Sequence, residues 1–101
     1  MSVIGETEGL DERLMEGLVR LAGEVPFKIR VTSGLRLEDH GSEHAHGLAA
    51  DIAVEGGGWH RRMLVEAALP LFDRVGVYDR HVHVGIDLTR PAPVLWVGKS
   101  R

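Results

Sequence analysis

An aspartate interrupts an otherwise apolar run near the middle of the chain. Asp51 lies at the centre of residues 48–54, and all the remaining residues of this run are small or apolar, which is typical of a buried strand. An isolated carboxylate is costly in such a strand unless a partner or a metal ion holds it. We therefore expect the fold to bring a partner to Asp51.

Histidine gathers near this aspartate and in one later segment. Five of the six histidines fall in these two places: His40, His44, His46, His81 and His83. Because strand residues alternate between faces, His81 and His83 are expected side by side on one face of a strand over 81–87. Imidazole nitrogens and one carboxylate suit Zn²⁺, and the chain has no cysteine, so the sequence predicts a zinc site built from nitrogen and oxygen ligands.

The hydrophobic patterns predict a single α+β domain over residues 1–101. Apolar residues spaced by three and four predict helices over 10–24 and about 59–72. Period-two or apolar runs predict strands over 27–33, 48–54, 74–78 and 81–87, and an edge strand over 94–97. This order indicates a small, mostly antiparallel sheet with flanking helices. His60 falls near the start of the second helix, where we expect it at the surface.

Charge and hydropathy limit the classes of partner. The net charge of −3 and the pI near 6.0 give no electrostatic reason to expect binding to nucleic acid or to an anionic membrane. No apolar run approaches the ~20 residues of a membrane helix, and no signal peptide is visible at the acidic N-terminus. A cytoplasmic protein and a phage-encoded lysin released to the cell wall both fit, and the oligomeric state is open.

The spacing of the first histidine segment resembles the signature of the M15 family of zinc peptidases. The family includes D-alanyl-D-alanine carboxypeptidases, the dipeptidases of vancomycin resistance and phage endolysins, and it shares a fold with the Hedgehog signalling domain. Five residues match in order and spacing: Ser42, His44, Gly47, Ala49 and Asp51. Residues 32–36 also resemble the family's Ser-Gly-x-Arg segment, and residues 82–84 resemble the strand that carries its last zinc ligand.

The resemblance implies a role for each matching residue. His44, Asp51 and His83 would bind zinc. Arg36 would bind the substrate carbonyl and the oxyanion formed from it, and His81 would stabilise the transition state beside the metal. The implied activity is hydrolysis of D-Ala-containing peptide bonds of bacterial peptidoglycan by metal-activated water, as a D,D-carboxypeptidase or an endopeptidase.

The identity of the general base stays open. Many family members carry an acidic residue three positions before the last zinc ligand, and Arg80 occupies that position here. The neighbouring Asp79 could serve instead, as could His81, whose unperturbed pKa of about 6.5 suits proton transfer. His46 is either a hydrogen-bond donor to a ligand or solvent-facing.

Two other classes of function remain as alternatives. Arg80 at the position of the base favours a non-catalytic domain in which zinc only stabilises a small fold. An oxygenase with a facial triad of two histidines and a carboxylate fits the spacing less well than the peptidase.

Overall fold

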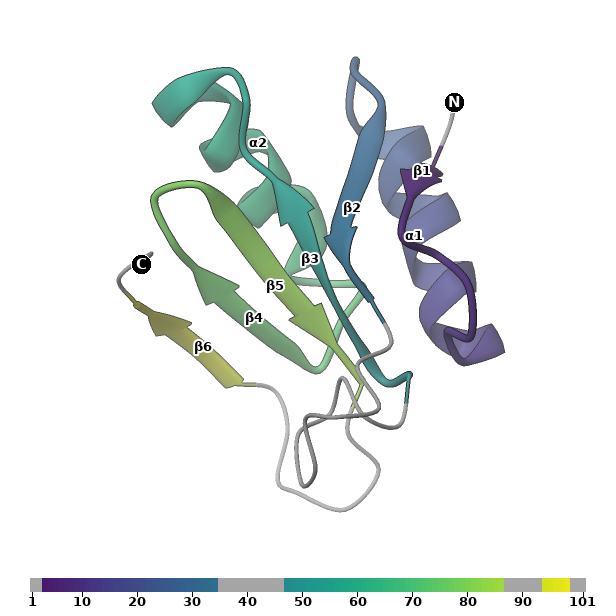
Figure 1. Ribbon diagram of the computed structural model, residues 1–101. Helices are drawn as coiled ribbons and strands as arrows, with labels where there is room; N and C mark the ends of the chain where they lie inside the picture. Colours follow the sequence, from purple (N-terminus) through teal and green to yellow (C-terminus); the bar gives the residue numbers. More distant parts are fainter. Residues whose placement is uncertain (1–2, 35–46, 87–93, 99–101) are drawn as a thin grey trace.

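The structure is a computed structural model that describes residues 3–34, 47–86 and 94–98. Within these ranges, two helices and six strands form the α+β domain that the sequence predicts (Figure 1). Their order along the chain is β1 (Val3–Gly5), α1 (Glu12–Glu24), β2 (Ile29–Ser33), β3 (Ala49–Ala53), α2 (Gly57–Ala68), β4 (Arg74–Val77), β5 (His81–Gly85) and β6 (Val94–Val97).

The strands form one mixed sheet in the order β1-β2-β3-β5-β4-β6. The central pairs β2·β3, β3·β5 and β4·β5 are antiparallel, as predicted, whereas β1·β2 and β4·β6 are parallel. Because β3 and β4 occupy both sides of β5, β6 pairs with the open edge of β4. Strand β6 runs opposite to β5 and is therefore parallel to β4. Three of the five strand pairs are antiparallel as predicted, and the two edge pairs make the sheet mixed.

One face of the sheet packs against both helices, which lie behind it in Figure 1. Alternate strand residues and one stripe of each helix form the core, whose largest members are Leu14, Leu18, Leu21, Ile29, Val31, Ile52, Leu64, Val75, Val82 and Val84. Burying each such side chain contributes roughly 1.5–3 kcal/mol. This face therefore supplies most of the apolar burial, and the residues between those strand positions point to the opposite face.

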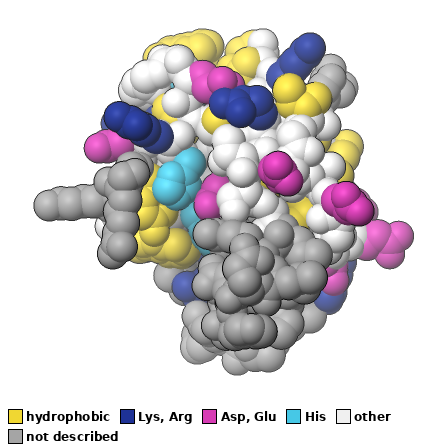
Figure 2. Space-filling view, in the orientation of Figure 1, with side chains coloured by type: hydrophobic (Ala, Val, Ile, Leu, Met, Phe, Trp, Pro, Cys, Tyr) yellow, Lys and Arg dark blue, Asp and Glu magenta, His cyan; other side chains and the backbone are white. Residues whose placement is uncertain are grey.

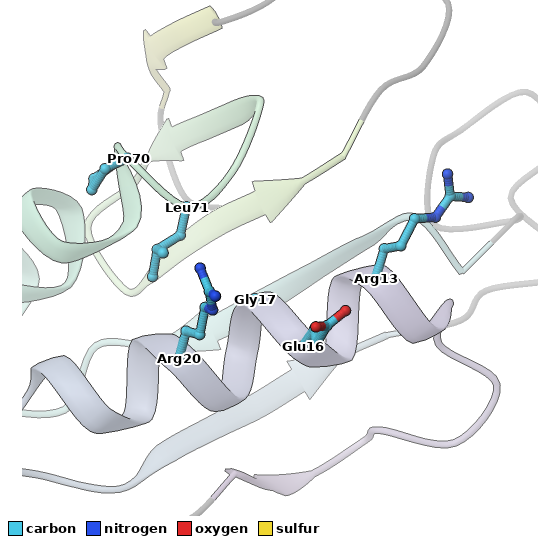
Figure 3. A pocket seen from close by; sticks show the side chains of 6 residues that line it. All are labelled: Arg13, Glu16, Gly17, Arg20, Pro70 and Leu71. Carbon is cyan, nitrogen blue, oxygen red and sulfur yellow. The ribbon is translucent and has the colours of Figure 1, made fainter.

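Helix α1 begins at a charged cap and approaches the rest of the core closely. The guanidinium of Arg13 donates two hydrogen bonds of 3.1 Å to the Asp11 carboxylate, and the backbone N–H of Arg13 donates a third at 2.9 Å; these bonds lower the pKa of Asp11. At Gly17 a Cβ atom would lie 2.7 Å from the ring of Phe72, so only glycine allows this approach. Beside it, between α1 and the α2–β4 connection, lies a hollow of about 290 Å³ (Figure 3), lined by Arg13, Glu16, Gly17, Arg20, Pro70 and Leu71.

The bounds of α2 differ from the prediction at both ends. The helix begins at Gly57 instead of about residue 59, and it ends at Ala68 instead of about residue 72. Pro70 follows shortly after this end, where its ring does no damage to the helix. Neither of the described helices is long and apolar enough to cross a membrane.

Candidate metal centre

Strand register places four residues in one row across the sheet. Asp51 of β3 is opposite His83 of β5, His83 is opposite Gly76 of β4, and Gly76 is opposite Trp96 of β6. Directly paired residues point to the same face, and this face is the one turned away from the helices. We call it the site face, defined by Asp51, His81, His83 and Trp96.

The partner of Asp51 is His83. Its Nδ1 lies 3.0 Å from Oδ1 of Asp51, although the two residues are 32 positions apart in the sequence. Their side chains are 12% and 14% exposed, so the pair is largely shielded from water. His81 lies on the same face with its Nε2 3.9 Å from the same carboxylate oxygen, and its side chain is 27% exposed. Figure 2 shows histidine and acidic side chains together on this face, beside hydrophobic surface.

The Asp51–His83 pair fits two ligands of one zinc ion. Zinc binds nitrogen and oxygen at about 2.0–2.2 Å with tetrahedral geometry, so two of its ligand atoms lie about 3.3 Å apart. The observed 3.0 Å is near this value, and His81 at 3.9 Å is farther. An imidazole nitrogen with a carboxylate oxygen is also a donor set that zinc uses in catalytic sites.

The third predicted ligand, His44, lies outside the described residues, as do Arg36, His40 and His46. Their roles stay predictions. Within the described ranges, no group of three histidine, aspartate, glutamate or cysteine side chains is placed to hold a metal ion.

The turn between β4 and β5 carries the other candidate for the general base. The side chain of Asp79 is 84% exposed there, and its carboxylate lies 3.7 Å from the guanidinium of Arg61 on α2. Among the described residues, no hydrogen bond or ion pair joins Asp79 to Asp51 or the histidines of the site face. Arg80 follows in the same turn, and its backbone carbonyl accepts a hydrogen bond from the N–H of Val54 at 2.9 Å.

Two aromatic residues of this site were not anticipated from the sequence. Trp96 has its ring centroid 5.3 Å from that of His83, and the ring of Tyr78 stacks on His81 at 4.2 Å with an interplanar angle of 12°. The indole N–H of Trp96 donates a hydrogen bond to the hydroxyl of Tyr78 at 2.9 Å. Alternation places Gly76 and Tyr78 on one face of their strand, as it does His81 and His83 on the next strand, and this signal could have identified Tyr78. The position of Trp96 could not be found in this way, because it depends on which strand β6 pairs with.

The prediction of a surface position for His60 is wrong. This residue is only 7% exposed, and its ring packs edge-on against Phe27 with centroids 4.0 Å apart. Its Nδ1 accepts hydrogen bonds from the backbone N–H groups of Glu55 and Gly56 at 2.9 and 2.8 Å. Burial lowers the pKa of His60, against the opposing effect of the Glu55 carboxylate. His60 therefore caps the start of α2, a role in which it is neutral.

Comparison with known proteins adds no relative. No protein-family model matches the chain, and a search of curated proteins finds no match. The resemblance to M15 peptidases thus rests on the motif residues and their spacing alone.

Proposed function

We propose that this protein is a zinc-dependent peptidase that hydrolyses D-Ala-containing peptide bonds of bacterial peptidoglycan, with zinc held by His44, Asp51 and His83. The observation that carries the proposal is the 3.0 Å contact between Asp51 and His83. The resemblance to M15 peptidases implies that both residues bind one metal ion, and they lie next to each other in the fold.

The candidate residues would have separate roles in such a reaction. Zinc, when bound, supplies a Lewis acid that polarises the scissile carbonyl and makes water nucleophilic near neutral pH. Asp51 and His83, both largely buried, would hold the ion from two paired strands. His81 is more exposed and points to the same face, so it is placed to take up or donate a proton beside the substrate. Arg36 provides the positive charge for the substrate oxygen.

Of the two candidate bases, His81 is the better supported. Its Nε2 lies 3.9 Å from Asp51, whereas the Asp79 carboxylate is paired with Arg61 on α2. The same ion pair also favours the second candidate function, a non-catalytic zinc-binding domain of the same fold. In that case the function does not need an acidic residue at the position that Arg80 occupies, because zinc serves only to stabilise the fold.

Hydrolysis by the zinc-loaded full chain separates these functions. Two substrates are used, a wall peptide ending in D-Ala-D-Ala and a cross-linked muropeptide, with products identified by mass spectrometry. We expect cleavage that stops with a chelator and returns with zinc, and that is lost in His83→Ala and Asp51→Asn. Glu66→Gln, which changes an exposed carboxylate of α2, is the matched control.

The possible outcomes distinguish the peptidase from the structural zinc-binding domain. Stoichiometric zinc without cleavage of either substrate would leave the structural domain as the function. A protein that binds no zinc would contradict both.

A further inference from the structure

The indole of Trp96 lies directly over the backbone of β4. A Cβ atom at Gly76 would lie 2.5 Å from Cζ2 and 2.6 Å from Cε2 of the indole, so only glycine at this position leaves room for the ring. Strands β6 and β5 are separated by β4, or about 9.6 Å at the usual strand spacing. Gly76 thus allows Trp96 to cross a whole strand and reach His83.

The orientation of the indole is held by its neighbours. Its N–H donates to the Tyr78 hydroxyl at 2.9 Å, and the guanidinium carbon of Arg74 lies 5.1 Å from the ring centroid. Tyr78, in turn, stacks its ring on His81 at 4.2 Å. In the described part of the chain, the ring of Trp96 thus lies against His83 and the ring of Tyr78 lies against His81, and a hydrogen bond joins the two aromatic side chains.

An imidazole on a strand needs such contacts to have one orientation. The strand fixes its Cβ atom, but rotation about the Cβ–Cγ bond of histidine has broad minima. For His83, Nδ1 lies 3.0 Å from Asp51 and the indole of Trp96 contacts the ring; a zinc ion bound to both Nδ1 and Oδ1 would replace a hydrogen bond between them, so the indole contact would remain. For His81, 3.9 Å to Asp51 is too long for a hydrogen bond, so the Tyr78 ring contributes more to its orientation than Asp51 does.

We propose that Trp96 and Tyr78 form an aromatic bracket that positions the rings of His83 and His81 for the metal and the substrate, with Gly76 providing the space for it. This inference rests on the proposed function for the identity of the metal. Neither aromatic residue is a ligand or a proton carrier in it. Changes to the partners that orient metal ligands typically weaken metal binding 10–100-fold, and we expect a loss of this size when the bracket is displaced.

The test uses variants that remove one part of the bracket at a time. Gly76→Ala pushes the indole away from His83, Trp96→Phe removes the N–H donor and shortens the side chain, and Tyr78→Phe removes only the hydroxyl. Trp59→Phe is the matched control, because Trp59 is 62% exposed on α2 and lies outside the bracket. Zinc affinity is measured by chelator competition, coordination geometry by the absorption spectrum of the Co²⁺-loaded protein, and folding by circular dichroism.

We expect zinc affinity to fall 10–100-fold in Gly76→Ala, with a changed Co²⁺ spectrum and retained secondary structure. Trp96→Phe and Tyr78→Phe should show smaller losses that are not additive in the double variant, since the two residues act through one hydrogen bond. Trp59→Phe should match the wild type. A bracket with only a structural role would lower the melting temperature but leave the Co²⁺ spectrum unchanged.

The inference is overturned if the bracket variants keep zinc affinity within twofold and the wild-type spectrum. If Gly76→Ala does not fold, the two phenylalanine variants decide. If the wild type binds no zinc, the proposed function fails separately. The bracket is then judged in the metal-free protein by the NMR coupling constants that report the side-chain torsion angles of His83, which must change in Trp96→Phe and must not change in Trp59→Phe.

Discussion

The cap formed by His60 makes the stability of this domain depend on pH in a predictable direction. Because Nδ1 accepts two backbone N–H groups, a proton on that nitrogen breaks both hydrogen bonds. Each is worth about 0.5–1.5 kcal/mol, and since Glu55 and Gly56 are exposed, water replaces part of the loss. We therefore take about 1 kcal/mol for the pair, or about 4–8 °C in melting temperature.

The lowered pKa of His60 sets the pH range of this effect. A histidine whose folded-state pKa lies below its unfolded value of about 6.5 binds its proton more readily in the unfolded chain. The stability from the cap is complete above pH 6.5, and it is lost as the pH falls from 6.5 through the folded-state pKa. The Glu55 carboxylate acts in the opposite direction but is the smaller effect.

His60→Asn isolates this contribution, because the Oδ1 of asparagine occupies the place of Nδ1 and does not titrate near neutral pH. We expect the variant to be less stable than the wild type at pH 8, because the ring contact with Phe27 is lost, and we expect this deficit to shrink by about 1 kcal/mol at pH 5. His60→Ala should be less stable at both values. Thermal unfolding of the metal-free proteins, followed by circular dichroism, measures the difference. Equal pH slopes for wild type and His60→Asn would refute the role of Nδ1 as acceptor.

Three further predictions concern the metal and the helices. Zinc at 100 times its dissociation constant should stabilise the wild type by about 2.7 kcal/mol, and Asp51→Asn should abolish this rise in melting temperature; an equal rise in the variant would remove Asp51 from the site. Gly17→Ala should destabilise the domain by about 1 kcal/mol, because the clash with Phe72 outweighs the helix propensity of alanine. Gly58→Ala should stabilise it by about 0.5 kcal/mol, because a Cβ atom there meets no atom within 4 Å. Denaturant unfolding measures both changes, and the same sign for both would contradict the packing argument. Asp11→Ala should lower the helix content and melting temperature through loss of the cap, and unchanged helicity by circular dichroism would contradict its capping role.

Strand β1 and residue His60 show why parts of the fold were not predictable. The three residues of β1 are too few for an alternation pattern, and they form a strand because β2 offers an open edge beside them. His60 follows three glycines near a helix start, which locally indicates exposure, yet Phe27 from a distant segment covers its ring. In both cases a contact between remote segments outweighed the local signal.

Local pattern alone determined the two helices, five of the six strands and the face on which His81 and His83 lie, because periodicity of apolar residues reports directly on burial. It also identified Asp51 as a residue in need of a partner. The choice of His83 as that partner and the row that continues through Gly76 to Trp96 depended on the order and register of four strands. Register is set by the packing of the whole sheet, and a slip of one residue would have turned Asp51 towards the core.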